Sequence, residues 1–165
     1  MYESKFGVER TRMMQTRLFQ IGLENGIKFS YGGKTGNTRN SHRLIALAKS
    51  KSPFMQTRTV EELFKLYFEQ EGDITSIAKL QEAGVKAGLD ESEVKSWLAS
   101  DDGGKEVDKE VREAQIRGIS GVPNFTIDGK YEVGGAQDES VFLQLFDRIK
   151  RGERSNVAVD NGSRC

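Results

Sequence analysis

The spacing of apolar residues predicts helices along most of the chain. Residues Val8–Asn25 place Met14, Leu18 and Ile21 at helical intervals, and Gly26 is positioned to end that helix. The segment Thr59–Glu71 has the broadest apolar stripe, so we expect it at the centre of the packing. The stripe consists of Val60, Leu63, Phe64, Tyr67 and Phe68. Further helices are predicted at His42–Lys49 (capped by Thr38, Asn40 or Ser41), from Asp73 or Thr75 to Ala87, after Asp90 with Glu93, at Lys105–Arg117 and at Gln137–Lys150.

Near the C-terminus the spacing of apolar residues changes from the helical period to strict alternation. Asn124–Ile127 alternates polar and apolar side chains, as a half-buried strand does. Asp128-Gly129 favours a type I′ turn, and Lys130–Val133 is then the returning strand. Pro123 has two interpretations: a proline that begins an edge strand, or a cis Val122-Pro123 bond that exposes the preceding backbone to a ligand.

A single hairpin leaves its apolar face without enough partners. A two-stranded sheet is marginal in water, and this hairpin is followed by only one helix. We therefore expect self-association through an incomplete sheet, either as a dimer or as poor solubility. The apolar side chains concerned are Phe125, Ile127, Tyr131 and Val133, together with Phe142, Leu145 and Phe146.

Composition narrows the classes of partner. The 165 residues fit one domain, and Lys plus Arg equals Asp plus Glu at 25 each. Because the charges balance, the protein has no net positive field to attract a phosphate backbone, so nucleic acid is not expected as a partner. No apolar run is long enough to cross a bilayer and no secretory signal begins the sequence, so we expect no membrane partner and a cytoplasmic protein.

Candidate catalytic groups are few. Cys165 is the sole cysteine and the last residue, and His42 is the sole histidine. An internal disulfide, a cysteine-based zinc site, a two-histidine metal site and a C-x-x-C pair are therefore excluded within the chain, and no cofactor is expected. Gly33-Lys34-Thr35 resembles the end of a phosphate-binding loop but lacks its first glycine and its preceding strand.

The segment "GISGVPNFTIDGKYEVGGAQDESVFLQLFDRI" resembles the DsbA-like thioredoxin-fold proteins of the FrnE and 2-hydroxychromene-2-carboxylate isomerase type. "GGKTGNTRNSHRLIALAK", "VEELFKLYFEQEGDI" and "AGVKAGLD" extend the resemblance upstream, so that it covers about residues 2 to 150. It implies an α/β thioredoxin-like fold with a large helical insertion. The N-terminal β-α-β unit would be missing, which leaves mostly helices and one β-hairpin.

The resemblance also implies a domain division and a site. Residues 1–117 would be the helical insertion domain, 118–150 the C-terminal half of the thioredoxin fold, and 151–165 a flexible tail. Val122-Pro123 matches the cis-proline loop, where the backbone of Val122 would pair with a bound peptide or thiol. Asn37, Thr38 and His42 match the polar edge of the helical domain near the cleft.

Three functions follow from the resemblance. The first is a FrnE-like thiol-disulfide oxidoreductase, N-terminally truncated and inactive as written because the C-x-x-C segment is absent. The second is a noncatalytic module that binds glutathione or a peptide. The third is a relative of the glutathione-dependent isomerases. The expected partners are a thiol or disulfide substrate or glutathione.

Overall fold

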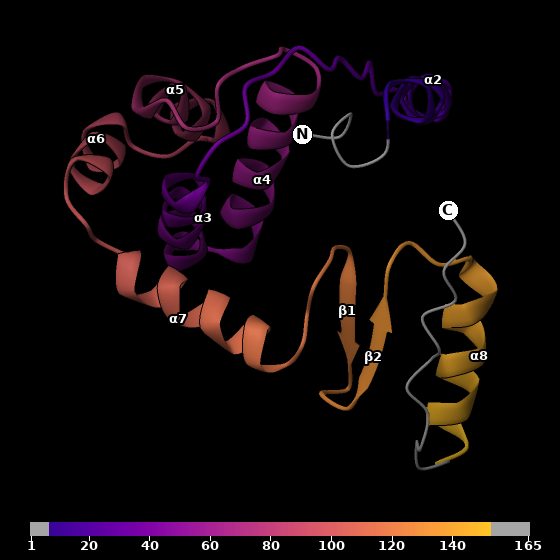
Figure 1. The fold of residues 1–165 in the computed structure, drawn as a ribbon. Helices are drawn as coiled ribbons and strands as arrows, with labels where there is room; N and C mark the ends of the chain where they lie inside the picture. The colour runs from indigo at the N-terminus through magenta and orange to yellow at the C-terminus, as the bar shows by residue number, and fades with distance from the viewer. Residues whose placement is uncertain (1–6, 153–165) are drawn as a thin grey trace. The chain divides into compact units, whose positions relative to one another are not determined.

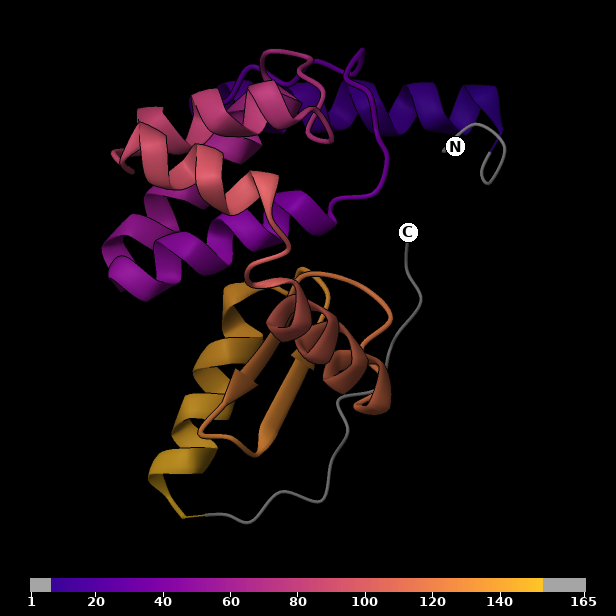
Figure 2. The same ribbon diagram turned by 90° about the vertical axis from the view of Figure 1, so that its left-hand side faces the viewer.

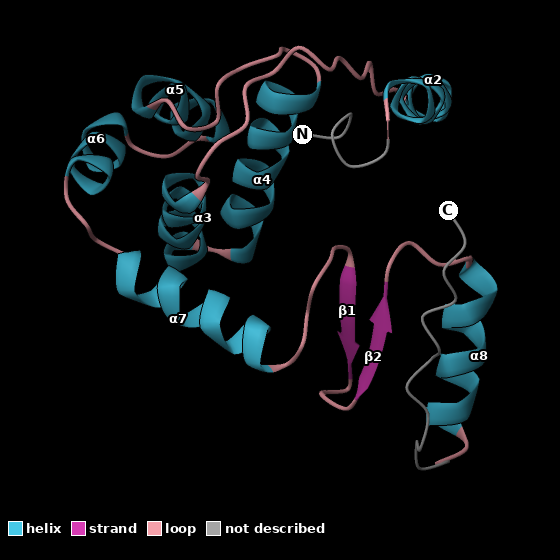
Figure 3. Ribbon diagram, viewed as in Figure 1, coloured by secondary structure: helices cyan, strands magenta, loops and turns pink. Residues whose placement is uncertain are grey.

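The structure, a computed structural model, describes residues 7–152 and places seven helices and one two-stranded antiparallel sheet in that part of the chain (Figures 1 and 3). Their order is α2 (Val8–Glu24), α3 (Arg39–Lys51), α4 (Pro53–Phe68), α5 (Ile77–Ala87), α6 (Glu91–Ala99), α7 (Gly104–Ile116), β1 (Asn124–Ile127), β2 (Tyr131–Gly134) and α8 (Glu139–Lys150).

The chain divides into two compact units, Met1–Lys109 and Glu110–Cys165, where length alone suggested one domain. We call them the helical unit and the hairpin unit. The division falls inside α7. The domain boundaries implied by the resemblance remain predictions, and most of the expected tail, 151–165, lies outside the described residues.

The helical unit has its core between α3, α4, α5 and α6. Leu44 and Leu47 of α3 meet Leu63 and Leu66 of α4 in one apolar cluster. Burial of these side chains stabilises the unit, because most of the stability of a helix in a protein comes from packing its apolar face. The remaining buried members are Ala48, Leu80, Ala83, Leu89, Val94 and Leu98.

Helix α4 begins six residues before the predicted start. Pro53 occupies its first turn, and the Ser52 hydroxyl accepts a hydrogen bond of 3.1 Å from the amide of Met55. Proline at that position costs no backbone bond, and Ser52 supplies the cap. The helix ends at Phe68 rather than Glu71, which has a positive φ of 54°.

The start of α5 also differs from the prediction. Ser76 is its N-cap residue, whereas Asp73 binds Thr75, accepting from its amide at 2.9 Å and from its hydroxyl at 2.6 Å. This local turn uses the carboxylate that would otherwise cap the helix. At the other end Gly88 adopts the left-handed conformation predicted for a terminating glycine.

Helix α2 has the bounds predicted for it to within one residue, and its apolar side chains lie largely in the open. Thr11 and Gly22 form its buried side, and a Cβ atom at Gly22 would lie 2.5 Å from a ring carbon of Phe29. Met14, Leu18 and Ile21 are each at least 40% exposed. The sequence therefore predicted the helix correctly but not how much of it would be covered.

The hairpin unit packs its two strands on α8 (Figure 2). The register pairs Phe125 with Val133, so these two side chains share one face of the sheet. Phe125 meets the ring of Phe142 edge to face with centroids 5.1 Å apart, and Val133 is buried.

The turn between the strands has the predicted backbone conformation, but it is one residue longer than predicted. Asp128 and Gly129 both have positive φ, as a type I′ turn requires. The register pairs Ile127 with Tyr131, so Lys130 belongs to the connection and not to β2. The amide of Lys130 donates to Ile127 O at 3.1 Å and closes the turn.

Candidate functional site

The segment that leads into β1 has the features expected of the predicted loop. Helix α7 ends at Ile116, Gly118 follows it with a φ of 72°, and the amide of Ile119 donates back to Ala114 O at 3.0 Å. The Val122-Pro123 bond is cis, and Pro123 immediately precedes β1. Val122 is 89% exposed.

Backbone groups beside this loop are open along one side of β1. Gly135 N donates to Pro123 O at 2.8 Å, which continues the strand register by one pair. In an antiparallel ladder such bonded pairs alternate with non-bonded ones. The peptide groups of Asn124 and Thr126 therefore point away from β2. We call this row the β1 edge; within residues 7–152 its backbone groups and those of Val122 have no hydrogen-bond partner.

The polar face of the hairpin carries a small charged cluster that the sequence analysis missed. Arg117 donates to the Thr126 hydroxyl at 2.6 Å and to the Glu132 carboxylate, and Thr126 also donates to Glu132 at 3.0 Å. The guanidinium of Arg117, followed by the Thr126 hydroxyl, lowers the pKa of Glu132. The cluster ties the end of α7 to both strands, and the spacing of 117, 126 and 132 gives no motif by which to find it.

The other three predicted site residues lie together at the start of α3. Thr38 is the N-cap residue, and its carbonyl accepts from the amide of His42 at 3.0 Å. The Asn37 side chain, not that of Thr38, accepts from the Arg39 amide at 2.9 Å. His42 is exposed. These residues belong to the helical unit, whereas Val122-Pro123 belongs to the hairpin unit.

Two arginines of α3 hold the segment between α6 and α7. Arg39 binds the carboxylate of Asp108 through Nε at 2.8 Å and that of Asp101 at 2.6 Å. These bonds, the one to Asp108 first, raise the pKa of Arg39 above its ordinary value. Gly104 leaves room for this pair, since a Cβ atom there would collide with the guanidinium and with Asp101.

Arg43, one helical turn further along α3, is 2% exposed. Its guanidinium donates to the carbonyls of Trp97 at 2.6 Å, Ser100 at 2.7 Å and Asp102 at 2.9 Å. It also reaches the Asn40 side chain at 2.9 Å, and the Trp97 indole donates to Arg43 O at 3.0 Å. The hydrogen bonds of this buried guanidinium go to the turn and to Asn40, so its role is to shape the turn.

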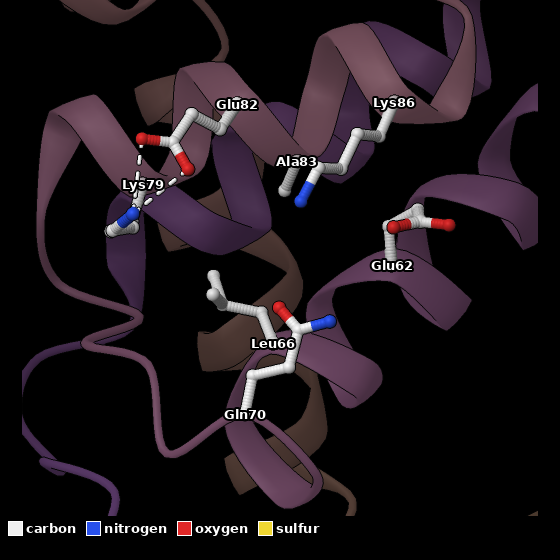
Figure 4. A pocket seen from close by; sticks show the side chains of 7 residues that line it. All are labelled: Glu62, Leu66, Gln70, Lys79, Glu82, Ala83 and Lys86. Carbon is white, nitrogen blue, oxygen red and sulfur yellow. Dashed lines mark hydrogen bonds and ion pairs between the residues drawn. The ribbon is translucent and has the colours of Figure 1, made fainter.

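The remaining surface of the described residues shows little that could do chemistry. A shallow depression between α4 and α5, of about 200 Å³ including open solvent, has Lys79 and Glu82 at its rim bound to each other at 2.9 Å (Figure 4). Among residues 7–152 no group of three His, Cys, Asp or Glu could hold a metal ion, and no helix there is long and apolar enough to cross a membrane. Cys165 lies outside the described residues.

Comparison with known proteins identifies the family. Residues 3–147 match the model of the DSBA-like thioredoxin domain. The chain belongs to the DsbA-like thioredoxin family. Its structure is similar to the crystal structure of a probable DsbA oxidoreductase from Streptomyces coelicolor, with a TM-score of 0.81 and 29% sequence identity over 100% of this chain and 71% of that chain. None of the curated proteins matches the sequence.

Membership of the DsbA-like family confirms the predicted fold class, which is mostly helical with one two-stranded antiparallel sheet. It also supports the thiol-disulfide oxidoreductase type of family that the resemblance implied.

Proposed function

We propose that this DsbA-like chain is a FrnE-like member that carries the substrate-binding loop of a thiol-disulfide oxidoreductase and does not itself exchange disulfides. The observation that supports the loop is Val122, whose side chain is exposed and whose backbone has no hydrogen-bond partner among residues 7–152. Such a backbone can pair with an extended peptide by main-chain hydrogen bonds.

The sequence supports the absence of exchange. One thiolate must attack the substrate disulfide, and a second thiol must then displace it from the mixed disulfide. The sequence has one cysteine, Cys165, so these 165 residues supply no second thiol. The N-terminal truncation implied by the resemblance stays a prediction, which reading the 5′ end of the transcript tests.

The first test measures insulin reduction by the 165-residue chain with dithiothreitol as the electron donor. We expect the rate of insulin precipitation to equal that of dithiothreitol alone, because no cysteine pair is present to relay electrons. A DsbA-family enzyme with its cysteine pair serves as the positive control. Turnover above background that persists in Cys165→Ser would contradict the proposal.

A second candidate, a noncatalytic module for glutathione or a peptide, rests on the same free backbone. Reduced glutathione titrated into the ¹⁵N-labelled chain should shift the amides of residues 119–126, with saturation. Val122→Pro removes the proposed amide donor and should abolish binding, whereas Val122→Ala keeps the amide and should bind. A flat titration removes this candidate.

The glutathione-dependent isomerase ranks third, because by resemblance its reactive serine or cysteine belongs to the same segment as the cysteine pair. We further propose a cytoplasmic location, because a sequence with a single cysteine fits a reducing compartment, and no nucleic-acid partner, because the charge is balanced. Asn37, Thr38 and His42 remain proposed contributors to binding, which substitution of Asn37 by alanine in the same titration would test.

A further inference from the structure

The loop between α2 and α3 passes the C-terminal end of α4 and is attached there by hydrogen bonds (Figure 1). Residues 27–38 have no regular secondary structure. The amide of Ser30 donates at 2.7 Å to the carbonyl of Phe68, the last residue of α4. One carboxylate oxygen of Glu71 accepts from both the hydroxyl of Ser30 and the amide of Gly32, the latter at 3.0 Å. The Glu71 carboxylate therefore holds the middle of this loop.

Glu71 makes the last hydrogen bond to the loop before Asn37, one of the predicted site residues. Within the described part of the chain, 7–152, residues 33–36 make no hydrogen bond. The side chain of Asn37 then accepts from the amide of Arg39 in α3. Two of the four residues 33–36 are glycines, which lose the most conformational freedom when a chain is ordered. The course of the loop toward Asn37 therefore depends on where Gly32 is held.

The backbone of Glu71 is strained where it makes this contact. Its φ of 54° is left-handed, a conformation that costs free energy for a residue with a side chain. Glycine would adopt the same conformation without that cost. Gly32 is fitted to the contact as well, because a Cβ atom there would lie 2.5 Å from a carboxylate oxygen of Glu71. The contact therefore requires a carboxylate at position 71 and no side chain at position 32.

We propose that Glu71 is a positioning residue, which orders residues 30–38 and so places Asn37 and Thr38 for binding. The binding role of these two residues rests on the proposed function, whereas the attachment of the loop to Glu71 does not. Both bonds reach a charged oxygen, so they are stronger than bonds between neutral groups. They offset part of the conformational entropy that the loop loses when it is ordered.

Two neutral substitutions of Glu71 separate the reach of its side chain from the conformation of its backbone. Glu71→Gln keeps Oε1, the oxygen that accepts both bonds. Glu71→Asn is one methylene shorter and does not reach Gly32, while asparagine tolerates positive φ better than glutamate. ¹⁵N relaxation of the 165-residue chain measures the result. We expect the order parameters of residues 32–37 to fall below about 0.6 in Glu71→Asn, whereas the conservative Glu71→Gln should retain the order of the loop.

Urea denaturation distinguishes this role from a general contribution to stability. The urea midpoint of Glu71→Asn should equal or exceed that of Glu71→Gln, because the backbone strain is relieved and the lost bonds belong to exposed groups. A lower midpoint would assign Glu71 to the stability of the helical unit and overturn the proposal.

Gly32→Ala tests the contact from its other side. Its Cβ atom should displace the Glu71 carboxylate, so the order parameters of the loop should fall as they do in Glu71→Asn. Combining the two substitutions should cause no further loss of order, because both remove the same contact. Additive losses would contradict a shared contact.

Reduced glutathione titrated into the same ¹⁵N-labelled variants tests the binding role. The Kd should rise at least about threefold in Glu71→Asn, because a smaller fraction of the chains has the loop in its binding conformation, and Glu71→Gln should rescue binding. Equal order parameters in the two variants would overturn the proposal, and so would a loss of order that leaves the Kd unchanged. If the wild-type chain binds no glutathione, the proposed function fails, and the order parameters alone decide whether Glu71 holds the loop.

Discussion

Arg43 shows how one side chain can set the path of a turn. The segment from Trp97 to Asp102 includes the last residues of α6 and most of its connection to α7, and three of its carbonyls converge on the Arg43 guanidinium. The planar group offers five donors in fixed directions, which suits several acceptors at once. The side chains of Ser100 and Asp102 also shape this turn, because the Ser100 hydroxyl donates to the Asp102 carboxylate at 2.7 Å and accepts from the Asp102 amide at 3.1 Å.

Replacing Arg43 should destabilise the helical unit strongly. Arg43→Met keeps much of the side-chain volume but leaves the carbonyls and Asn40 without their donor, so we expect a loss of about 3 kcal/mol in the free energy of unfolding. Urea denaturation followed by circular dichroism measures it. Arg39→Met, which removes a partly exposed arginine of the same helix, is the matched control and should cost less. Equal losses for the two variants would argue against the role given to Arg43.

At the residue scale, part of the candidate site was predicted from the sequence. The Val122-Pro123 loop was predicted because proline and the Asp128-Gly129 turn constrain the backbone locally. Arg43 and Arg117 were missed because their partners are distant in sequence. Arg43 binds main-chain carbonyls more than fifty residues away, which composition cannot reveal.

Helix ends show the limits of apolar periodicity. The stripe of α4 is recognisable only from Thr59 onward, although the helix begins at Pro53. The earlier turn is specified by Ser52 and Pro53, a cap followed by a proline, and not by hydrophobic residues. For α6 the Asp90 cap was predicted correctly, and its carboxylate accepts from the Glu93 amide at 2.9 Å.

The Ser52 cap should contribute measurably to stability. Ser52→Ala leaves the Met55 amide without its acceptor and should cost about 1 kcal/mol in the free energy of unfolding. Ser76→Ala is the control, because Ser76 is also an N-cap residue but its side chain makes no capping bond. Thermal or urea unfolding of both variants decides the point. Similar losses would mean that the hydroxyl of Ser52 does not act as a cap.

The apolar face of each helix could be predicted from the sequence, but the elements that pack against it could not. On α4, Leu63 is buried as the stripe predicts, but Phe64 is more than half exposed. Both belong to one stripe, and only the positions of the neighbouring helices distinguish them. The sequence pattern of one helix does not contain that information.

For the whole molecule, the family and fold class followed from the order of segments along the chain. The number of strands and the hairpin were also predicted, since turn chemistry is local. The sequence did not predict which apolar side chains are buried within each unit, because burial depends on the packing of elements far apart in sequence.

Stability should fall in acid. Hydrogen bonds to carboxylates lower the pKa of Glu71 (from Ser30 first, then Gly32), of Asp90 (from Ser92, then Glu93) and of Asp138 (from Ser140) below the ordinary 4.5 for Glu and 3.8 for Asp. The folded state then binds protons more weakly than the unfolded state, so these contributions are complete above about pH 5 and are lost as the pH falls through the lowered pKa values.

Urea midpoints measured from pH 7 to pH 3 should therefore be level at first and then decline below about pH 4.5. Added salt should reduce the stability contributed by Glu132, because its carboxylate is paired with the charged Arg117. The stability contributed by Asp90 should fall less, because the hydrogen bonds to that carboxylate come from neutral donors. A midpoint unchanged down to pH 3 would show that these carboxylates titrate alike in the folded and unfolded chain.

Helix α7 has a practical consequence for anyone who separates the two units. The division between Lys109 and Glu110 falls within its thirteen residues, so no extended linker marks a natural place to cut. A gene split there would leave each fragment with half a helix and several amides or carbonyls stripped of their partners. A fragment intended to fold should therefore contain all of α7. A protease that cleaves extended linkers meets a helix at the division between the units.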